Sequence, residues 1–388
     1  MLQPDYMLAR RLSLAGLLLT LIALALGACG QSQPPTPTMV AQQEREVRYP
    51  GVASVTLAGT LVIPAHRSGQ RVPGVIIIAG SGPTDRNGND PKLGLMTNLY
   101  QQIADQLAQQ GIASLRYDKR GVGSSTQAPM PHNPAQPTAQ ELAAVQNFQA
   151  WDNYMGDALA TLRYLQQQPE IDAARTAPIG HSEGAYIAEE LANPSQQLAH
   201  PPAALVVISG PGRPYDVGLR EQIDHALERD HSSADTTAFV LTRYDAIVAS
   251  LKQTGQVPQE PLLEIELNPQ VPLDIKSLMA SLFTAYNDKF WQGAFKVNPV
   301  PLMQQYAGPV LVLQGEKDTQ VFATEDTPLL DAALKSRQPD DHQTVIIPNC
   351  SHNMKFVQDP TKDPGTAGPI LPEAASTLRS WLAMKLHP

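Results

Sequence analysis

The sequence contains little cysteine, with only Cys29 and Cys350 among 388 residues. Cys29 ends an apolar run near the N-terminus, so the remainder of the chain holds a single cysteine. A disulfide within that remainder is therefore excluded, even in an oxidising compartment. We expect the fold to depend on its apolar core alone, and a hydrophobic content of 42% argues against disorder for most of the chain.

Basic residues are also few, because 28 Lys and Arg stand against 37 Asp and Glu, giving a formal net charge of −9. Surfaces that bind nucleic acid are basic, so we expect no nucleic-acid partner. His, Asp and Glu do not recur at the spacing of metal ligands, and we expect no metal site.

The N-terminal segment has the layout of a targeting signal. Arg10 and Arg11 precede an apolar run over residues 12–26, which is too short to span a bilayer comfortably. The run ends in Leu-Gly-Ala-Cys at residues 26–29, which resembles a bacterial lipobox. That resemblance implies cleavage before Cys29 and acylation of its thiol and amine. The alternative is an ordinary signal peptide with a chance cysteine.

We therefore expect a signal peptide over residues 1–28 and a proline-rich tether over residues 29–43. Two or three acyl chains would anchor the protein stably. The expected location is the cell envelope, as a membrane-anchored lipoprotein that faces outside the cytoplasm, with the membrane as a partner through the anchor.

The rest of the chain alternates strand-like and helix-like segments. This alternation predicts an α/β fold with a doubly wound, mostly parallel sheet and helices on both faces. The expected strands are residues 55–63, 73–79, 112–117, 175–180, 203–209, 309–314 and 342–347. The expected helices are residues 93–110, 151–168, 183–192 and 372–385.

One long interval interrupts the alternation, and a structureless loop of that length would be unusual. We interpret residues 211–300 as a mainly helical cap inserted into a core formed by residues 44–210 and 301–388. Helical patterns near 216–251 and 274–291 are separated by a proline-studded stretch over 257–272.

Ser182 lies at the centre of Gly180-His181-Ser182-Glu183-Gly184, between a strand and a helix. The G-x-S-x-G pattern places a serine on a sharp strand-to-helix turn, where flanking side chains would collide with the backbone. We predict that Ser182 is a nucleophile, and that the N–H of Glu183 at the helix start is one oxyanion donor.

A serine hydroxyl needs a base, and the base needs an orienting acid. His352 follows the strand over 342–347, at the carboxyl edge of the sheet, and is the predicted base. Asp318 follows the strand over 309–314 and is the predicted acid, with Glu316 as its rival. Ser81, in the glycine-rich loop after the strand over 73–79, is the predicted source of the second oxyanion N–H.

We expect the polar residues of two further loops to have structural roles and no catalytic role. Asp85 and Arg86 are expected to pair locally, in a segment that can form an Asx-type turn. Asp118 and Arg120 are expected to brace the loop that follows the strand over 112–117.

Together these motifs resemble the α/β-hydrolase superfamily, and the segment from Gly80 to Asn89 is similar to a bacterial esterase branch with a G-S-G-P-x-D-R pattern. The resemblance implies hydrolysis of small acyl esters without a cofactor. The pair Ala79-Gly80 departs from the His-Gly frequent at this place, which removes a side chain that braces the loop.

The function favoured by the sequence is therefore a serine hydrolase that cleaves carboxylic esters. A serine aminopeptidase or amidase with the same triad is an alternative, for which acidic cap residues such as Glu221, Asp224 and Glu228 could hold a substrate amino group. A non-catalytic binding lipoprotein on a hydrolase fold is a third interpretation, and the presence of every triad member argues against it.

Overall fold

The computed structural model describes residues 38–387, and the predictions for the signal peptide, for Cys29 and for most of the tether lie outside that range. A short strand β1 (Met39–Val40) and the first residue of β2 fall at the end of the segment expected to be a tether. Among the described residues, no helix is both long and apolar enough to cross a membrane.

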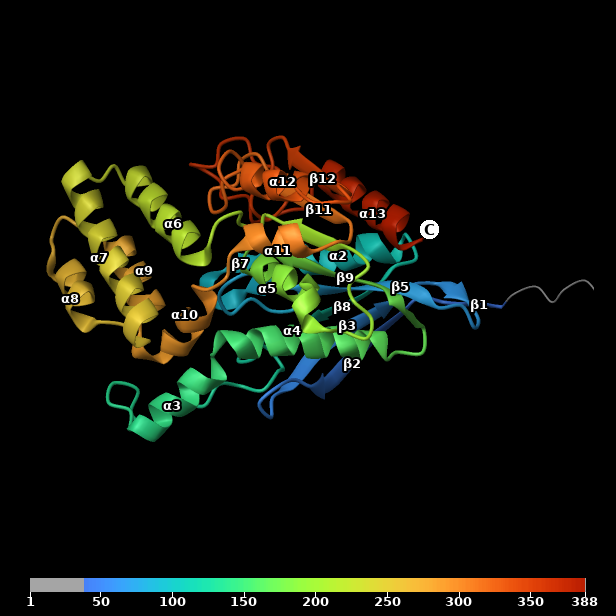
Figure 1. Cartoon of the computed structure of the whole chain (residues 1–388), viewed down its shortest axis with the longest axis horizontal. Coiled ribbons are helices and arrows are strands. Elements are labelled where there is room, and N and C mark those ends of the chain that lie inside the picture. The colour runs from blue at the N-terminus through green and yellow to red at the C-terminus, as the bar shows by residue number, and fades with distance from the viewer. Residues whose placement is uncertain (1–37, 388) are drawn as a thin grey trace, which may run out of the picture. The chain divides into compact units, whose positions relative to one another are not determined.

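From Val40 onward the chain forms one compact unit around an eight-stranded sheet with the order β12-β11-β10-β9-β5-β8-β3-β2. The strands run parallel from β12 to β8, whereas β3 is antiparallel to β8 and β2 is antiparallel to β3. The strands are β2 (Gln43–Pro50), β3 (Thr56–Ile63), β5 (Val72–Ile78), β8 (Ala113–Tyr117), β9 (Ile171–His181), β10 (Leu205–Ile208), β11 (Val310–Gly315) and β12 (His342–Ile347). The predicted fold class is confirmed (Figure 1).

Helices cover both faces of this sheet because its central strands are apolar on both sides. In β5, Ile76 and Ile78 belong to one core cluster and Val75 and Ile77 to the other, as the two-residue period of a strand requires. The first cluster includes side chains of α4 (Trp151–Gln166), α5 (Glu183–Ala192) and α12 (Thr327–Lys335). The second includes side chains of α2 (Leu99–Ala108) and α13 (Pro372–Leu386).

Some elements differ from the sequence expectations. Helix α2 begins at Leu99 instead of residue 93, because residues 89–96 hold the short hairpin strands β6 (Asn89–Asp90) and β7 (Leu95–Met96) and the turn η1 (Pro91–Leu93). Helix α3 (Ala139–Phe148) was not predicted, although Thr138 and Glu141 form a capping box at its start. Strand β2 and helix α12 were not predicted either. The remaining short elements are β4 (His66–Arg67) and η2 (Pro194–Gln196).

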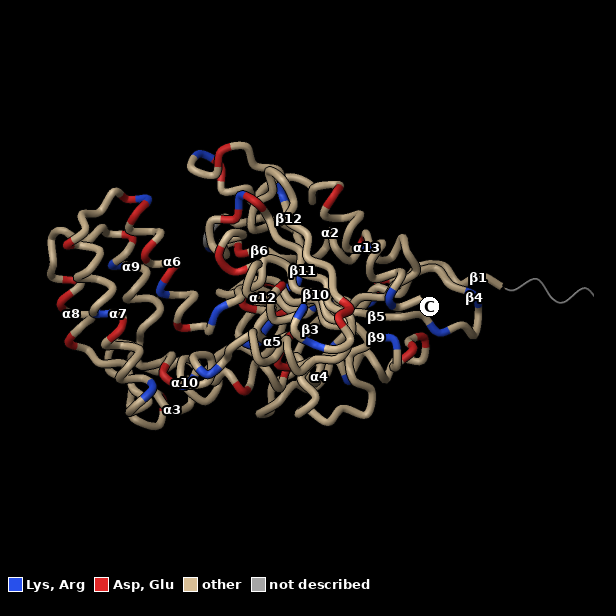
Figure 2. Tube along the Cα trace, turned by 45° about the horizontal axis from the view of Figure 1, so that its top comes forward, with Lys and Arg blue, Asp and Glu red and all other residues tan. Residues whose placement is uncertain are grey.

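Residues 215–294 form helices that leave the sheet and gather beside it (Figure 1). They are α6 (Tyr215–Arg229), α7 (Ala234–Thr254), α8 (Gln259–Leu267), α9 (Leu273–Leu282), the turn η3 (Ala285–Asn287) and α10 (Asp288–Ala294), after which α11 (Pro299–Gln305) returns the chain to the sheet. We call α6 to α10 the cap. Acidic positions are spread over α6, α7 and α8 (Figure 2).

The helical pattern over 216–251 comprises two helices, since Ser233 caps a new one at α7. The proline-studded stretch also contains a helix, which was not expected. Pro258 occupies the N-cap position of α8 and Pro261 lies in its first turn, where a missing backbone N–H costs nothing. Prolines here mark the start of a helix.

Candidate active site

Ser182 occupies the turn between β9 and α5, in a backbone conformation that is rare for a residue with a side chain. Its φ is 54° and its ψ is −124°, and its N–H donates to the carbonyl of Ile208 at 3.0 Å. Positive φ in a non-glycine residue is strained and persists only where the surrounding structure enforces it. Here the end of β10 and the start of α5 enforce it.

The two glycines of the motif are required by close backbone approach. A Cβ atom on Gly180 would lie 2.3 Å from the carbonyl oxygen of Gly184, and one on Gly184 would lie 2.3 Å from the carbonyl oxygen of Ile78. Neither neighbour is a flexible side chain, so a larger residue at either place would displace β5 or α5. The glycines therefore allow the tight turn that holds Ser182 at the end of the sheet.

The predicted base and acid are hydrogen-bonded to each other. Nδ1 of His352 lies 2.8 Å from Oδ2 of Asp318 and 3.0 Å from Oδ1, and both residues are buried. Oδ1 also accepts from the N–H groups of Gln320 and Val321, at 2.8 and 3.0 Å, while Oδ2 accepts from Nε2 of Gln314 at 2.9 Å. Burial raises the pKa of the Asp318 carboxyl, but His352 and the backbone donors outweigh burial and hold it below its ordinary value. Asp318 is therefore held as an anion.

Gly315 explains how the two loops come together. A Cβ atom there would lie 2.5 Å from the carbonyl oxygens of both Cys350 and Ser351, so the end of β11 and the loop that carries His352 touch through their backbones. The rival acid, Glu316, faces another way: its carboxylate accepts from the N–H of Asn349 at 2.9 Å and its side chain is 47% exposed. Glu316 supports the loop from outside.

His352 is held next to the Ser182 turn by its own carbonyl group. This oxygen accepts from Nε2 of His181 at 3.0 Å and from the hydroxyl of Ser209 at 3.0 Å. The rings of His181 and His352 have centroids 4.7 Å apart. The residue that precedes Ser182 therefore fixes the backbone of the predicted base.

The loop that carries Ser81 approaches Ser182 from the end of β5. A Cβ atom on Gly80 would lie 3.2 Å from the Cβ of Ser182, a contact tight enough that a larger residue would push the two backbones apart by a few tenths of an ångström. Ser81, Ser182 and Glu183 line one cavity. The predicted oxyanion donors and the predicted nucleophile are thus adjacent, and their catalytic roles stay predictions.

That cavity has a volume of about 520 Å³ and lies between the carboxyl edge of the sheet and the cap. Its polar wall includes the buried pair Lys119 and Glu183, whose charged atoms are 3.6 Å apart, and Tyr215 donates to the Glu183 carboxylate at 2.7 Å. Burial lowers the pKa of the Lys119 ammonium, although Glu183 opposes that shift. The aromatic side chains in its lining are Phe148, Tyr154, Tyr186, Tyr215, Phe290, Trp291 and Phe322.

Comparison with known structures identifies this architecture. An α/β hydrolase from Penicillium sp. sh18, GrgF, superposes with a TM-score of 0.50 at 15% identity, over 89% of this chain and 98% of its own. The chain has the α/β-hydrolase fold. A hypothetical protein from Pseudomonas aeruginosa, PA2218, also reaches a TM-score of 0.50, at 13% identity over 92% of this chain and 97% of its own.

The sequence matches cover only part of this chain. Residues 93–254 match a family model described as serine aminopeptidase, S33. Two uncharacterized proteins of Mycobacterium tuberculosis, MT2364 and Rv2307c, are each 32% identical, over 184 and 179 residues. These matches cover 44% and 43% of this chain, which spans about half the length of both relatives, at 55% and 53%.

The prediction that Arg86 pairs within its own loop is wrong. Arg86 does not pair with its neighbour Asp85: its guanidinium binds Asp118 at 2.8 Å and also contacts Glu46. Asp85 accepts from the N–H groups of Asn87 and Asn89, at 2.8 and 2.9 Å, which is the expected Asx-type turn. The pair between Arg86 and Asp118 could not be predicted from either loop, because the two residues are 32 positions apart in sequence. They meet because β5 and β8 are parallel neighbours, so that the loops after these strands lie side by side.

The bracing expected of Asp118 and Arg120 is present. Asp118 accepts from the N–H of Ser124 at 2.9 Å, and Arg120 pairs with the buried Asp157 at 2.8 Å. Both side chains therefore fix the loop that follows β8 and carries Lys119.

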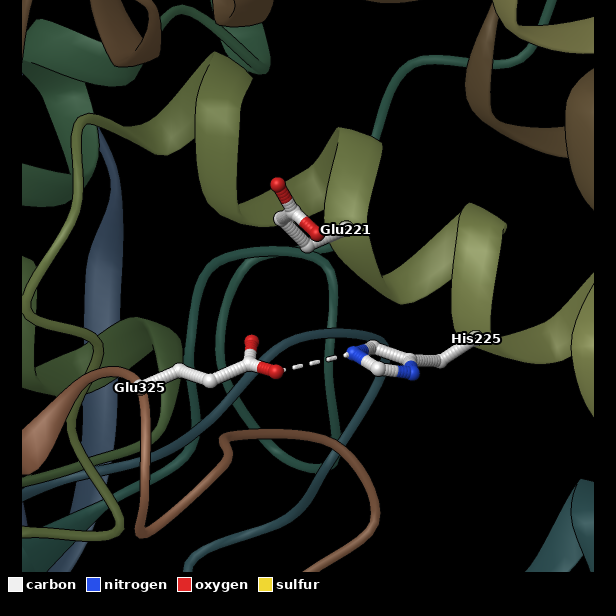
Figure 3. A group of neighbouring side chains, drawn as sticks. All are labelled: Glu221, His225 and Glu325. Atoms are coloured by element: carbon white, nitrogen blue, oxygen red, sulfur yellow. Dashed lines mark ion pairs between the residues drawn. The ribbon is translucent and has the colours of Figure 1, made fainter. Parts of the chain in front are cut away.

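One group of potential metal ligands joins the cap to the core of the hydrolase fold. Glu221 and His225 on α6 face Glu325 on the loop before α12, with ligand atoms within 4.8 Å of one another (Figure 3). His225 lies 3.3 Å from Glu325, and Arg213 pairs with both glutamates. Because Arg213 already supplies the positive charge, these contacts form an ion-paired link between cap and core.

Proposed function

We propose that this chain is a serine hydrolase that cleaves small carboxylic esters, with Ser182, His352 and Asp318 as its triad. The observation that carries the proposal is the convergence of three strand ends: a strained serine after β9, a buried acid after β11 and a histidine after β12 that binds the acid at 2.8 Å. This is the arrangement that nucleophilic acyl transfer needs.

In the proposed reaction, His352 removes the proton from the Ser182 hydroxyl as its oxygen attacks the ester carbonyl. The N–H groups of Ser81 and Glu183 stabilise the oxyanion that forms. His352 then gives the proton to the leaving alcohol, which leaves an acyl-enzyme on Ser182. Water, deprotonated by His352, releases the carboxylic acid and restores the serine, while Asp318 keeps the imidazole oriented.

The cavity chemistry supports an ester with an apolar part. Aromatic and aliphatic residues of the cap, such as Phe290, Trp291 and Leu278, face the polar edge where Ser182 lies. Pockets of this size that combine an apolar wall with a few convergent polar groups bind small organic molecules.

A serine aminopeptidase is the second candidate, favoured by the family model that matches residues 93–254. Three carboxylates, Glu183, Glu221 and Asp326, line the cavity, and any of them could attract a substrate amino group. Glu183 is already engaged by Lys119 and Tyr215, and Arg213 pairs with the other two. Since all three carboxylates are paired, we favour the ester.

Comparing two substrate series will separate the candidates. We expect p-nitrophenyl acetate and butyrate to be hydrolysed with kcat/KM at least about 100-fold above that for alanine or proline p-nitroanilide, because all three cavity carboxylates are already paired and none is free for an ammonium group. The measurement is the initial rate of p-nitrophenol or p-nitroaniline release by the purified chain. A preference for the anilides would replace the esterase proposal by the aminopeptidase one.

We further propose that the protein is a lipoprotein of the cell envelope, anchored through Cys29. The support is the sequence pattern over residues 10–29. Each buried CH₂ of an acyl chain contributes about 0.8 kcal/mol, so two or three chains hold a protein on a membrane. We expect Cys29→Ser to move the protein from the membrane pellet to the soluble fraction in its bacterial host, with Cys350→Ser as the control. Retention of Cys29→Ser in the pellet would contradict the anchor.

A further inference from the structure

Gly80 is held by buried side chains through both of its backbone polar groups, the N–H of the peptide that precedes it and the carbonyl of the peptide that joins it to Ser81. Nζ of Lys119 donates to the Gly80 carbonyl oxygen at 2.5 Å, and the Gly80 N–H donates to the Tyr100 hydroxyl at 2.8 Å. In a trans peptide the carbonyl of one residue and the N–H of the next point in opposite directions. Fixing the Gly80 carbonyl therefore fixes the direction of the Ser81 N–H.

The Tyr100 hydroxyl also contacts Nδ1 of His181 at 2.9 Å. His181 in turn contacts the His352 carbonyl through Nε2 at 3.0 Å. A continuous path of hydrogen bonds thus runs from Gly80, beside the predicted oxyanion hole, to the backbone of the predicted base. Tyr100 and His181 are 3% and 4% exposed, so water does not compete for these bonds.

The direction of every bond in this path follows from the groups involved. A carbonyl oxygen only accepts, so Nε2 of His181 must carry a proton. Burial and the nearby His352 lower the pKa of His181 to about 3, so the ring is neutral and its Nδ1 only accepts. Tyr100 must then donate to Nδ1, which leaves its oxygen free to accept from the Gly80 N–H. Every donor in the path therefore has an acceptor, and no two donors face each other.

We propose that Tyr100 and His181 are positioning residues that join Gly80, which directly precedes the oxyanion N–H of Ser81, to the backbone of His352, so that the two halves of the site keep a fixed separation. This inference rests on the proposed function. Lys119 holds the next peptide, between Gly80 and Ser81, through the Gly80 carbonyl. The three side chains do the bracing that the His-Gly pair, absent at Ala79-Gly80, would otherwise provide.

Tyr100→Phe tests the proposal because it removes one oxygen atom and preserves the ring. We expect kcat for p-nitrophenyl acetate to fall about 10- to 100-fold, less than the loss of a whole oxyanion donor, with KM within about two-fold. The pH at which kcat/KM is half-maximal should not move, because no group in the path titrates near neutrality.

Tyr306→Phe is the matched control. Tyr306 is equally buried and donates to the Pro202 carbonyl at 2.9 Å, so the same oxygen is lost outside the cavity lining. We expect its kcat to stay within about two-fold of the wild type, with a comparable change in Tm. If Tyr100→Phe and Tyr306→Phe lose the same kcat, or if the pH midpoint moves, the positioning role is wrong.

A double-mutant cycle with His181→Asn tests whether Tyr100 and His181 act as one unit. If they do, the double variant loses little more kcat than the worse single variant. Losses that multiply would mean independent effects and would overturn the path.

A measurement that does not depend on turnover tests the positioning proposal separately from the esterase proposal. In ¹⁵N spectra of the histidine side chains, His181 should be neutral with its proton on Nε2. A proton on Nδ1 would overturn the path even in an inactive protein. Absence of Ser182-dependent turnover in the wild type, with the Nε2–H form present, would instead count against the proposed function alone.

Discussion

Ser182→Ala is expected to lower kcat for p-nitrophenyl acetate by about 10⁴-fold or more, because it removes the hydroxyl proposed to form the acyl-enzyme. Labelling by a fluorophosphonate should be lost completely, as seen by intact-protein mass. KM and Tm should change little, since alanine fills the same position with one atom fewer.

Ser54→Ala is a suitable control for this variant. Ser54 is exposed and also has a positive φ, of 61°, so this substitution likewise places an alanine at positive φ. We expect Ser54→Ala to keep wild-type turnover and labelling. Labelling that persists in Ser182→Ala would place the nucleophile elsewhere and refute the proposed function.

Asp318→Asn is expected to have the second-largest effect, lowering kcat by about 10³- to 10⁴-fold. Both carboxylate oxygens accept hydrogen bonds: Oδ1 from two backbone N–H groups and Oδ2 from Gln314 and His352. Whichever way an asparagine amide is turned, its NH₂ group faces donors. The His352 ring would be misoriented or forced into the wrong tautomer.

The same conflict should reduce stability, because an unsatisfied buried polar group costs about 1–3 kcal/mol. Urea unfolding will measure that loss, and initial rates will measure kcat. Glu316→Gln is the matched control, since Glu316 is two residues away and partly exposed. We expect it to stay within about three-fold of wild-type kcat. Equal losses in both variants would leave the identity of the acid open, and a larger loss in Glu316→Gln would make Glu316 the acid.

Local patterns predicted seven of the eight strands of the sheet and the helices α2, α4, α5 and α13 that pack on it, but not β2 or α12. The apolar run in β5 and the glycines around Ser182 predict their structures because the constraint is local: a strand buried on both faces, or a turn too tight for a Cβ atom. The loops of Asp318 and His352 could be placed for a related reason. Parallel strands end at one edge, so residues that follow them converge.

Other features depend on contacts between segments far apart in sequence. Arg86 was paired with the wrong aspartate, because the geometry between the loops after β5 and β8 has no signature in either loop. The cap helices were placed only roughly, since their boundaries depend on packing among α6 to α10. The capping box before α3 is, by contrast, a local sequence pattern that marks the start of this helix.

The sequence by itself determined the sheet except for its edge strand β2, the turn at Ser182 and the strand ends where Asp318 and His352 lie, because periodicity and glycine sterics act over a few residues. Only the tertiary structure decided which groups hold these residues in place. Tyr100 and Lys119 resemble ordinary side chains in the sequence, and His181 fills a variable position of the motif. Their roles arise because folding buries all three beside Gly80 and His352, where each polar atom must find a partner.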